Sequence, residues 1–317
     1  DYTPSGTSSW TQVGGDIDGE AADDTSGFAV SLSSDGSRVA IGAPSNDAGG
    51  NLAGHVRIYQ YNNNSWSQLG DDIDGEAATD YSGFSVSLSS DGSRVAIGGP
   101  YNDGNGSDSG HVRIYDYNGS AWVQVGADIN GEAASDNSGR SISLSSDGSR
   151  VAIGAHRNDG NGSDSGHVRI FDYNGSAWVQ VGEDINGEAA SDNSGWSVSL
   201  SSDGSRVAIG AYGNDGNGSN SGHVRVYTLS PGESYQYAWD VDNGNNSAPS
   251  DGTYRATIAG SDLAGNAYSG TESITFTLDT TAPTVTLTDT DSDNLVSISE
   301  VVTITAGFSE AMTATPT

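Results

Sequence analysis

The chain has 317 residues, of which 33% are apolar and 45 are glycine. Its 42 acidic residues outnumber 11 basic ones, giving a formal net charge of −31, and it has no cysteine. This charge repels phosphate backbones and anionic lipids, so composition argues against nucleic acid as a partner. No apolar stretch has the length of a membrane span, which excludes direct membrane insertion. The absence of cysteine excludes thiol chemistry but is compatible with a secreted protein.

The first 229 residues contain a repeat of 56 residues that predicts an all-β fold. The pattern of each unit predicts four strands. In the second copy they cover residues 85–89, 94–97, 111–117 and 122–129. Asp-Gly and Asn-Gly turns join them, because both pairs accept the positive φ of tight turns. Sheets this small are marginal alone, so the copies must stack face to face. The spacing is carried by Trp10, Trp66, Trp122 and Trp178, and by His55, His111, His167 and His223.

The ends of the repeat array predict how it closes. The first three strands occur four times, whereas the Trp-bearing fourth strand follows only the first three copies. The spare copy of that strand lies at the N-terminus, around Trp10. We therefore expect a four-bladed β-propeller in residues 1–229, closed by the N-terminal strand, which leaves no open sheet edge. The alternative is an open array of stacked repeats.

The repeat resembles a known family. Gly27-Phe28, the run VSLSSDGSRVAIGAP that ends at Pro44, and the run that begins Gly54-His55 are similar to the FG-GAP repeat of integrin-type propellers. The resemblance covers residues 10–229 and implies a propeller fold. The family usually has seven blades, and its calcium loop lies between the first two strands. Here that turn is too short to wrap an ion, so the resemblance transfers no calcium site to Asp35, Asp91, Asp147 or Asp203.

After Pro231 the composition changes to Thr-rich strands that resemble the immunoglobulin-like repeats of large bacterial surface proteins. Residues 230–281 resemble the second half of such a repeat, and residues 282–317 resemble the first half of another. We expect the chain to be an excised piece of a longer protein, cut across a tandem array of β-sandwich segments. Asp279-Thr280-Thr281 also resembles an O-glycosylation signal of secreted Bacteroidota proteins, which makes Thr280 a candidate modification site.

Two kinds of acidic segment are candidates for calcium. Asp289, Asp291 and Asp293 place three carboxylates at alternate positions, where they repel one another unless a cation lies between them. The ten-residue loops of the repeats offer oxygen ligands at similar spacing, although turn formation also explains Asp and Asn there. The loop candidates are Asp103, Asn105, Asp108, Asp159, Asn161, Asp164, Asp215 and Asn217.

Positions that differ among the otherwise near-identical repeats predict a ligand-binding surface. Phe28, Phe84, Arg140 and Trp196 occupy one equivalent position, and Pro44, Pro100, His156 and Tyr212 occupy another. The second set lies where the long loops begin, and aromatic or Arg side chains there could stack on sugars or anchor a protein. Neutral variation on a solvated rim is the alternative. The predicted ligand-binding residues are Tyr101, His156, Arg157, Trp196 and Tyr212.

We expect no catalytic residue and no enzyme activity, because His, Ser and Asp recur four times, as packing residues do. The predicted function is a non-catalytic binding module of a large secreted adhesin of the Bacteroidota type, with the propeller as head on an immunoglobulin-like stalk. The expected location is the cell surface, and the expected partner is a glycan or a surface protein. The alternative is a structural subunit of an extracellular filament, in which the propeller packs against other copies of itself. Calcium is the only cofactor that the sequence suggests.

Overall fold

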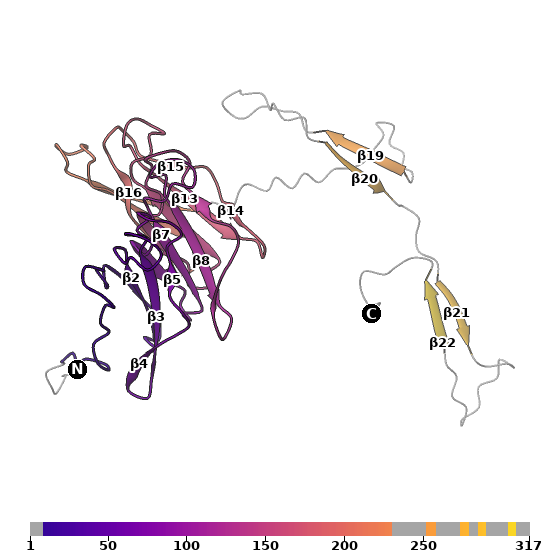
Figure 1. The fold of residues 1–317 in the computed structure, drawn as a ribbon. Helices are drawn as coiled ribbons and strands as arrows, with labels where there is room; N and C mark the ends of the chain where they lie inside the picture. The colour runs from indigo at the N-terminus through magenta and orange to yellow at the C-terminus, as the bar shows by residue number, and fades with distance from the viewer. Residues whose placement is uncertain (1–8, 230–251, 258–272, 279–284, 290–303, 309–317) are drawn as a thin grey trace, which may run out of the picture. The chain divides into compact units, whose positions relative to one another are not determined.

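The computed structural model describes residues 9–229 and four short strands of the tail (Figure 1). The chain divides into two units, Asp1–Gly232 and Glu233–Thr317. All described secondary structure is β, and no helix among these residues could cross a membrane. The fold class predicted from alternating apolar residues is confirmed as all-β.

The first unit contains four antiparallel sheets, one for each repeat. Of the four strands predicted for each repeat, the first three recur in every sheet as neighbours, in the order first, second, third. The first sheet comprises β1 (Ala29–Leu32), β2 (Arg38–Ala43), β3 (His55–Asn62), β4 (Ser65–Gln68) and β5 (Ile73–Asp74). The second comprises β6 (Ser85–Leu88), β7 (Arg94–Gly99), β8 (His111–Tyr117), β9 (Trp122–Gln124) and β10 (Ile129–Asn130). The third comprises β11 (Ser141–Leu144), β12 (Arg150–Ala155), β13 (His167–Tyr173), β14 (Trp178–Gln180) and β15 (Ile185–Asn186), and the fourth comprises β16 (Ser194–Leu200), β17 (Arg206–Ala211) and β18 (His223–Thr228).

The outer strand of each complete sheet is broken, whereas the sequence predicts one continuous strand over residues 122–129. In the second sheet β9 and β10 both pair with β8, at opposite ends of it. Gly126 lies in the break and has a φ of +76°, a backbone conformation that favours glycine. A Cβ at this position would lie 2.9 Å from Cδ1 of Trp178, and the Nε1 of Trp178 donates to the Val125 carbonyl at 2.9 Å. The break therefore leaves space, and a free carbonyl acceptor, for the tryptophan side chain of the next repeat.

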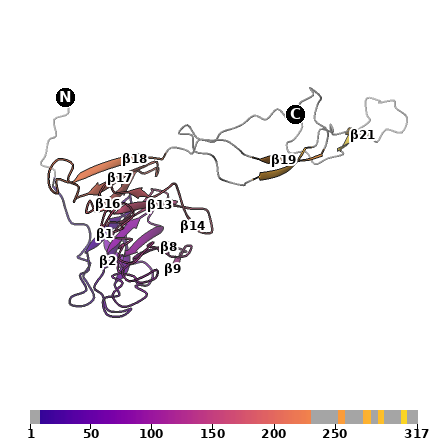
Figure 2. The same ribbon diagram turned by 90° about the horizontal axis from the view of Figure 1, so that it is seen from above.

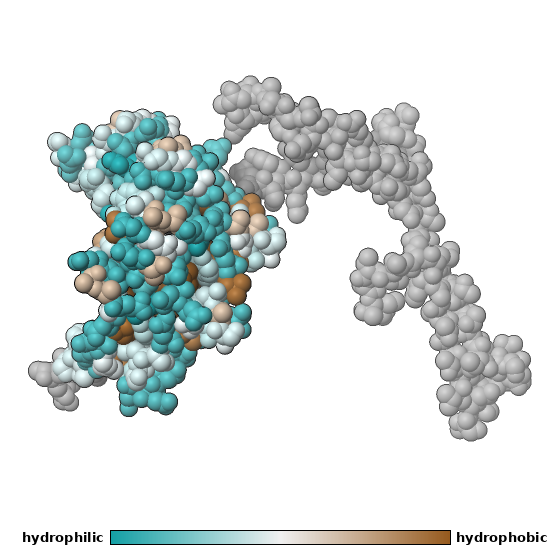
Figure 3. Space-filling model, viewed as in Figure 1, coloured by the Kyte–Doolittle hydropathy of each residue, from teal (hydrophilic) through white to brown (hydrophobic). Residues whose placement is uncertain are grey.

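Successive sheets stack face to face (Figure 2). One apolar cluster is buried at each interface between them. Between the second and third sheets, Ile114 from β8 packs with Leu144 from β11, and they are 2% and 8% exposed. Polar contacts also cross this interface, because Arg94 donates to the Gly148 carbonyl at 2.9 Å while forming a two-pronged ion pair with Asp116. The face of the repeat array seen in Figure 3 is mainly hydrophilic, in keeping with the acidic composition.

The predicted closure by the N-terminal strand is not observed among the described residues. The fourth sheet has only β16, β17 and β18 there, and Trp10 is fully exposed. The N-terminal segment instead lies against the first sheet, where Val13 accepts from Nε1 of Trp66 at 2.8 Å. Leu69 accepts from Trp122 in the same way at 2.7 Å, so the segment repeats the contact that each outer strand makes with the next repeat. The described residues thus form an open array of four blades.

The second unit contains two antiparallel strand pairs. β19 (Gly252–Thr257) pairs with β20 (Ser273–Leu278), and β21 (Val285–Asp289) pairs with β22 (Ile304–Phe308). Asp289 ends β21, whereas Thr280, Asp291 and Asp293 lie outside the described residues. The immunoglobulin-like assignment and the boundary at residues 281–282 stay predictions.

Candidate functional site

The position that varies among repeats forms a ladder of side chains across the four sheets. Phe28, Phe84 and Arg140 directly precede the first strands of their sheets, and Trp196 lies in β16. The Phe28 and Phe84 ring centroids are 4.7 Å apart. The Cζ of Arg140 lies 4.5 Å from the Phe84 ring centroid and 4.1 Å from that of Trp196, so the guanidinium is held between two aromatic rings.

A second row of side chains comes from the loops that follow the second strands, and it faces this ladder. The Tyr101 centroid lies 6.2 Å from that of Phe84. His156 and Tyr212 contact Trp196 edge to face, with centroid distances of 4.9 and 4.7 Å. The two rows enclose a cavity of about 420 Å³, which we call the binding groove; its lining includes Phe84, Tyr101, Arg140, His156, Arg157, Asp164, Trp196 and Tyr212.

The five residues predicted to bind a ligand therefore lie together, in one groove at the root of the long loops. The sequence prediction omitted Phe84 and Arg140. Both belong to the other variable position, and that variation was the signal for them. Arg140 was missed because a charged residue that replaces an aromatic one resembles ordinary surface variation. Its role becomes visible only in the structure, where Phe84 and Trp196 lie on either side of it.

The binding groove is locally cationic in a chain of strongly negative charge. Arg140 and Arg157 line it against a single carboxylate, Asp164, which lies 3.6 Å from Nε of Arg157. Among the described residues, the Arg140 guanidinium makes no hydrogen bond or ion pair, and burial lowers its pKa without removing its charge. Burial, followed by the charges of Arg140 and Arg157, lowers the pKa of His156 to about 4, so this imidazole is neutral at pH 7.

The polar side chains of the acidic loops mostly form hydrogen bonds within the loops or to neighbouring loops. Asp103 accepts from the amide of Asp108 at 2.8 Å, and Asp159 accepts from the amide of Asp164 at 2.8 Å. The amide group of Asn105 donates to the Gly131 and Glu132 carbonyls of the neighbouring loop, and Asn161 makes the equivalent bonds. Asp215 likewise accepts from Asn220, and Asn217 donates its backbone amide to Ser221. These bonds explain Asp and Asn by loop geometry, and calcium binding there stays a prediction.

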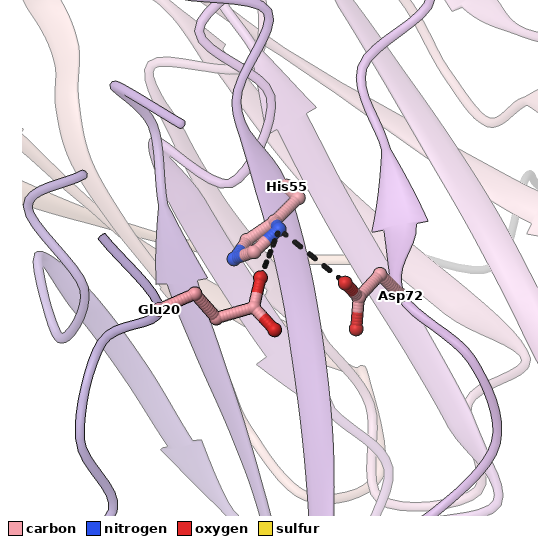
Figure 4. A group of neighbouring side chains, drawn as sticks. All are labelled: Glu20, His55 and Asp72. Carbon is pink, nitrogen blue, oxygen red and sulfur yellow. Dashed lines mark ion pairs between the residues drawn. The ribbon is translucent and has the colours of Figure 1, made fainter. Parts of the chain in front are cut away.

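A different polar constellation recurs three times at the repeat spacing. Each group contains a Glu, a His and an Asp whose potential ligand atoms lie within 4.8 Å of one another: Glu20–His55–Asp72, Glu76–His111–Asp128 and Glu132–His167–Asp184. In the first group, Oε2 of Glu20 and Oδ2 of Asp72 each lie 3.8 Å from Nδ1 of His55 (Figure 4). We call these groups the Glu–His–Asp triads.

The sequence prediction treated these histidines as packing residues. His55, His111 and His167 are indeed about 1% exposed, but the Nδ1 of each lacks a hydrogen-bond partner. Burial, opposed in part by the nearby carboxylates, lowers the pKa of His111 and His167 to about 4. Burial also raises the pKa of Glu76 and Glu132. The signal for the triads was the shared 56-residue period of Glu, His and Asp.

Comparison with known proteins supports the repeat assignment. The family described as FG-GAP repeat matches residues 130–171 and 186–227, within the third and fourth repeats. No curated protein matches the chain. The FG-GAP resemblance is thus confirmed for part of the array, whereas the adhesin and immunoglobulin-like resemblances stay predictions.

Several solved structures show a distant likeness. A protein named as a candidate 6-phosphogluconolactonase from Bacteroides uniformis is 14% identical, with a TM-score of 0.45, over 64% of this chain and 50% of that one. The periplasmic gluconolactonase of Pseudomonas aeruginosa is 15% identical, with a TM-score of 0.43, over 78% of this chain and 69% of that one. The hydrazine synthase of Kuenenia stuttgartiensis is 14% identical, with a TM-score of 0.37, over 62% and 45%. The chain therefore spans about half the length of the first of these proteins.

The expectation that the chain is not an enzyme is corrected by these comparisons. Two of the similar structures carry the names of lactonases, so a repeated β architecture gives no ground for excluding catalysis. The recurrence of His, Ser and Asp in all four repeats was a weak argument against catalysis, because the side chains that line the binding groove differ from one repeat to the next. With TM-scores below 0.5, the likenesses assign no reaction to this chain.

Proposed function

We propose that the repeat array is a carbohydrate-binding module and that the binding groove holds an acidic sugar chain. One observation carries this proposal: Arg140 is stacked between Phe84 and Trp196 and has no carboxylate partner among the described residues. A guanidinium held between two rings offers N–H donors from a restricted position, which suits a carboxylate ligand.

The aromatic side chains supply the second half of the recognition. Trp196 and Tyr212 are 37% and 51% exposed, although they contact each other edge to face. Exposed aromatic rings beside a cavity of this size offer apolar faces to the C–H surface of a sugar ring. A sugar that carries a carboxylate would therefore use both components, with its ring on the aromatics and its charge near Arg140 and Arg157.

The test is a binding titration with oligogalacturonides, with their methyl-esterified forms as uncharged controls. Arg140→Phe places in the third repeat the residue found at the same position in the first two, so it should fold. We expect this variant to lose at least tenfold in affinity, because it removes the charge and keeps the ladder. Trp196→Ala should lose a similar amount, whereas Tyr61→Ala, an aromatic outside the groove, should bind as the unmodified chain does. Equal binding by Arg140→Phe would refute the proposal.

We propose further that the module works outside the cell, on the surface of the organism that secretes it. The zero cysteine count and the strongly acidic composition are compatible with that setting. The tail would serve as the stalk, in line with its resemblance to immunoglobulin-like repeats. Surface labelling of intact cells with an antibody to the repeat array would test the location, and labelling only after lysis would contradict it.

A second function, self-association into a filament, is supported by the two ends of the array. Val30 and Leu32 of β1 are 64% and 59% exposed, whereas Leu88 at the equivalent position of β6 is 8% exposed. At the other end, Val224 and Val226 of β18 are 68% and 66% exposed, whereas Val112 of β8 is fully buried. The free faces therefore match the two sides of an interface that the array already makes three times, so a second copy would fit head to tail.

Analytical ultracentrifugation over a range of concentrations tests this second function. Head-to-tail stacking predicts species larger than a dimer, and Leu32→Asp should abolish them by charging one free face. Ser67→Asp is the matched control, because it adds the same charge at an exposed position of β4 that is not one of the free-face residues. A chain that stays monomeric at all concentrations would exclude the filament and leave the carbohydrate proposal unaffected.

A further inference from the structure

The Glu–His–Asp triads have a geometry that hydrogen bonding within the protein does not explain. The His Nδ1 atoms lie 3.7–3.8 Å from the Glu Oε2 atoms and 3.8–4.0 Å from the Asp Oδ2 atoms. These separations exceed the hydrogen-bond range of about 2.7–3.2 Å. A buried polar atom without a partner is rare and destabilising, yet it recurs in three repeats.

Each carboxylate of a triad divides its two oxygens in the same way. In the second triad, Oε1 of Glu76 faces Nη1 of Arg113 at 3.6 Å, and its Oε2 faces His111. Likewise, Oδ1 of Asp128 accepts from Nε2 of Gln124 at 2.6 Å, and its Oδ2 faces His111. The other two triads repeat this pattern with Arg57 and Gln68, and with Arg169 and Gln180. One oxygen of each Asp is thus held by a hydrogen bond from Gln, one oxygen of each Glu faces Arg, and the other oxygen of each carboxylate converges on the imidazole nitrogen.

We propose that each triad binds a divalent transition-metal ion, for which Zn²⁺ is the best match, through His Nδ1, Glu Oε2 and Asp Oδ2. Three protein ligands with a water in the fourth position are a common zinc arrangement, and carboxylate and imidazole ligands lie about 2.0–2.2 Å from the ion. Tetrahedral ligands at that distance are roughly 3.4 Å apart, so the carboxylate oxygens need to approach the imidazole nitrogen by only a few tenths of an ångström, and the two carboxylate oxygens already lie within 4.8 Å of each other. Calcium fits less well, because it takes six to eight oxygen ligands and the triads supply a nitrogen.

The ion would connect separate segments of the fold. Glu76 lies in the loop that leaves the first sheet, whereas His111 belongs to β8 and Asp128 directly precedes β10 of the second sheet. Glu132 joins the second sheet to the third in the same manner. Bound zinc would therefore hold each inter-sheet loop to the sheet that follows it, and should stabilise the array by mass action.

The test uses the full chain, stripped of metal with chelator and titrated with Zn²⁺ by calorimetry in excess Ca²⁺. The calcium occupies sites made of surface carboxylates alone, so the remaining zinc binding reports sites with nitrogen. Asp72→Asn, Asp128→Asn and Asp184→Asn are made singly and together, because Asn keeps the oxygen that accepts from Gln and removes the ligand oxygen. Asp71→Asn is the matched control, since it makes the same charge change one residue away at a position that is Ala127 in the next repeat.

We expect each single Asp→Asn variant to lose one bound Zn²⁺ per chain, and the triple variant to lose three. Zinc should raise the melting temperature of the unmodified chain and of Asp71→Asn, but not that of the triple variant. Co²⁺ substitution should give the intense visible absorption of four-coordinate cobalt in the unmodified chain. The proposal is overturned if the unmodified chain binds no Zn²⁺ in excess Ca²⁺, or if the triple variant binds as much as the control. The first result would leave the triads as packing groups.

Discussion

At the scale of single residues, His156 shows how the groove couples charge to stability. It is 8% exposed, contacts the Trp196 ring edge to face, and lies close to Arg140 and Arg157. Its pKa in the folded protein, about 4, is below the ordinary value of 6.5. The folded state therefore binds fewer protons than the unfolded state, and the stability held above pH 6.5 is lost as the pH falls towards 4.

His156→Tyr provides the measurement, because Tyr212 occupies the same position in the next repeat. We expect the melting temperature of the variant to fall less between pH 6.5 and pH 4 than that of the unmodified chain. Comparing the two chains isolates His156 from His111 and His167, which have similarly lowered pKa values. Parallel melting curves would show that His156 is not a source of the acid sensitivity.

Gly110 illustrates a residue that the stacking of repeats makes irreplaceable. It has a φ of +75°, and a Cβ there would lie 2.2 Å from the Ser138 carbonyl oxygen of the next repeat. Gly119 also has a positive φ, +98°, but a Cβ there would meet nothing within 4 Å. We expect Gly119→Ala to cost about 1–2 kcal/mol through backbone strain alone. Gly110→Ala adds the steric clash and should cost more than about 3 kcal/mol, as measured by chemical denaturation; equal losses would refute this explanation.

At the scale of elements, the sequence predicted the inner three strands of each sheet closely. Alternating apolar residues and the Asp-Gly turns are local signals, and β6, β7 and β8 begin at the predicted residues. The break in the outer strand was not predictable in this way. It depends on the tryptophan of the following repeat entering beside Gly126, a contact between residues 52 apart that no local pattern reveals.

Equivalent leucines in different sheets test the arrangement of these elements. Leu144 is 8% exposed between the second and third sheets, whereas Leu32 is 59% exposed on the free face of the first. Leu144→Ala should cost about 2–5 kcal/mol, because it leaves a cavity in the core. Leu32→Ala should change the stability by less than about 0.5 kcal/mol. A large loss from Leu32→Ala, in a chain shown to be monomeric, would mean that β1 is covered and that the array is closed.

At the scale of the whole molecule, the sequence predicted the location of the binding groove better than its chemistry. Variation at two positions of a near-identical repeat pointed to Trp196 and Tyr212, and periodicity placed both positions in every blade. The stacking of Arg140 between rings required the distance between blades, which the sequence does not contain. The Glu–His–Asp triads were not predicted, because their residues do not vary among the repeats and the histidines were interpreted as packing residues.

The central claim is that ligand binds at Trp196, and fluorine NMR of the chain labelled with 5-fluorotryptophan tests it directly. The chain has six tryptophans, so we expect six fluorine resonances, and loss of one in Trp196→Phe assigns the resonance of the groove. On addition of an oligogalacturonide, we expect the Trp196 resonance to shift while those of Trp66, Trp122 and Trp178 stay in place. A titration that moves the resonance of one of those three tryptophans instead, or none at all, would contradict the account.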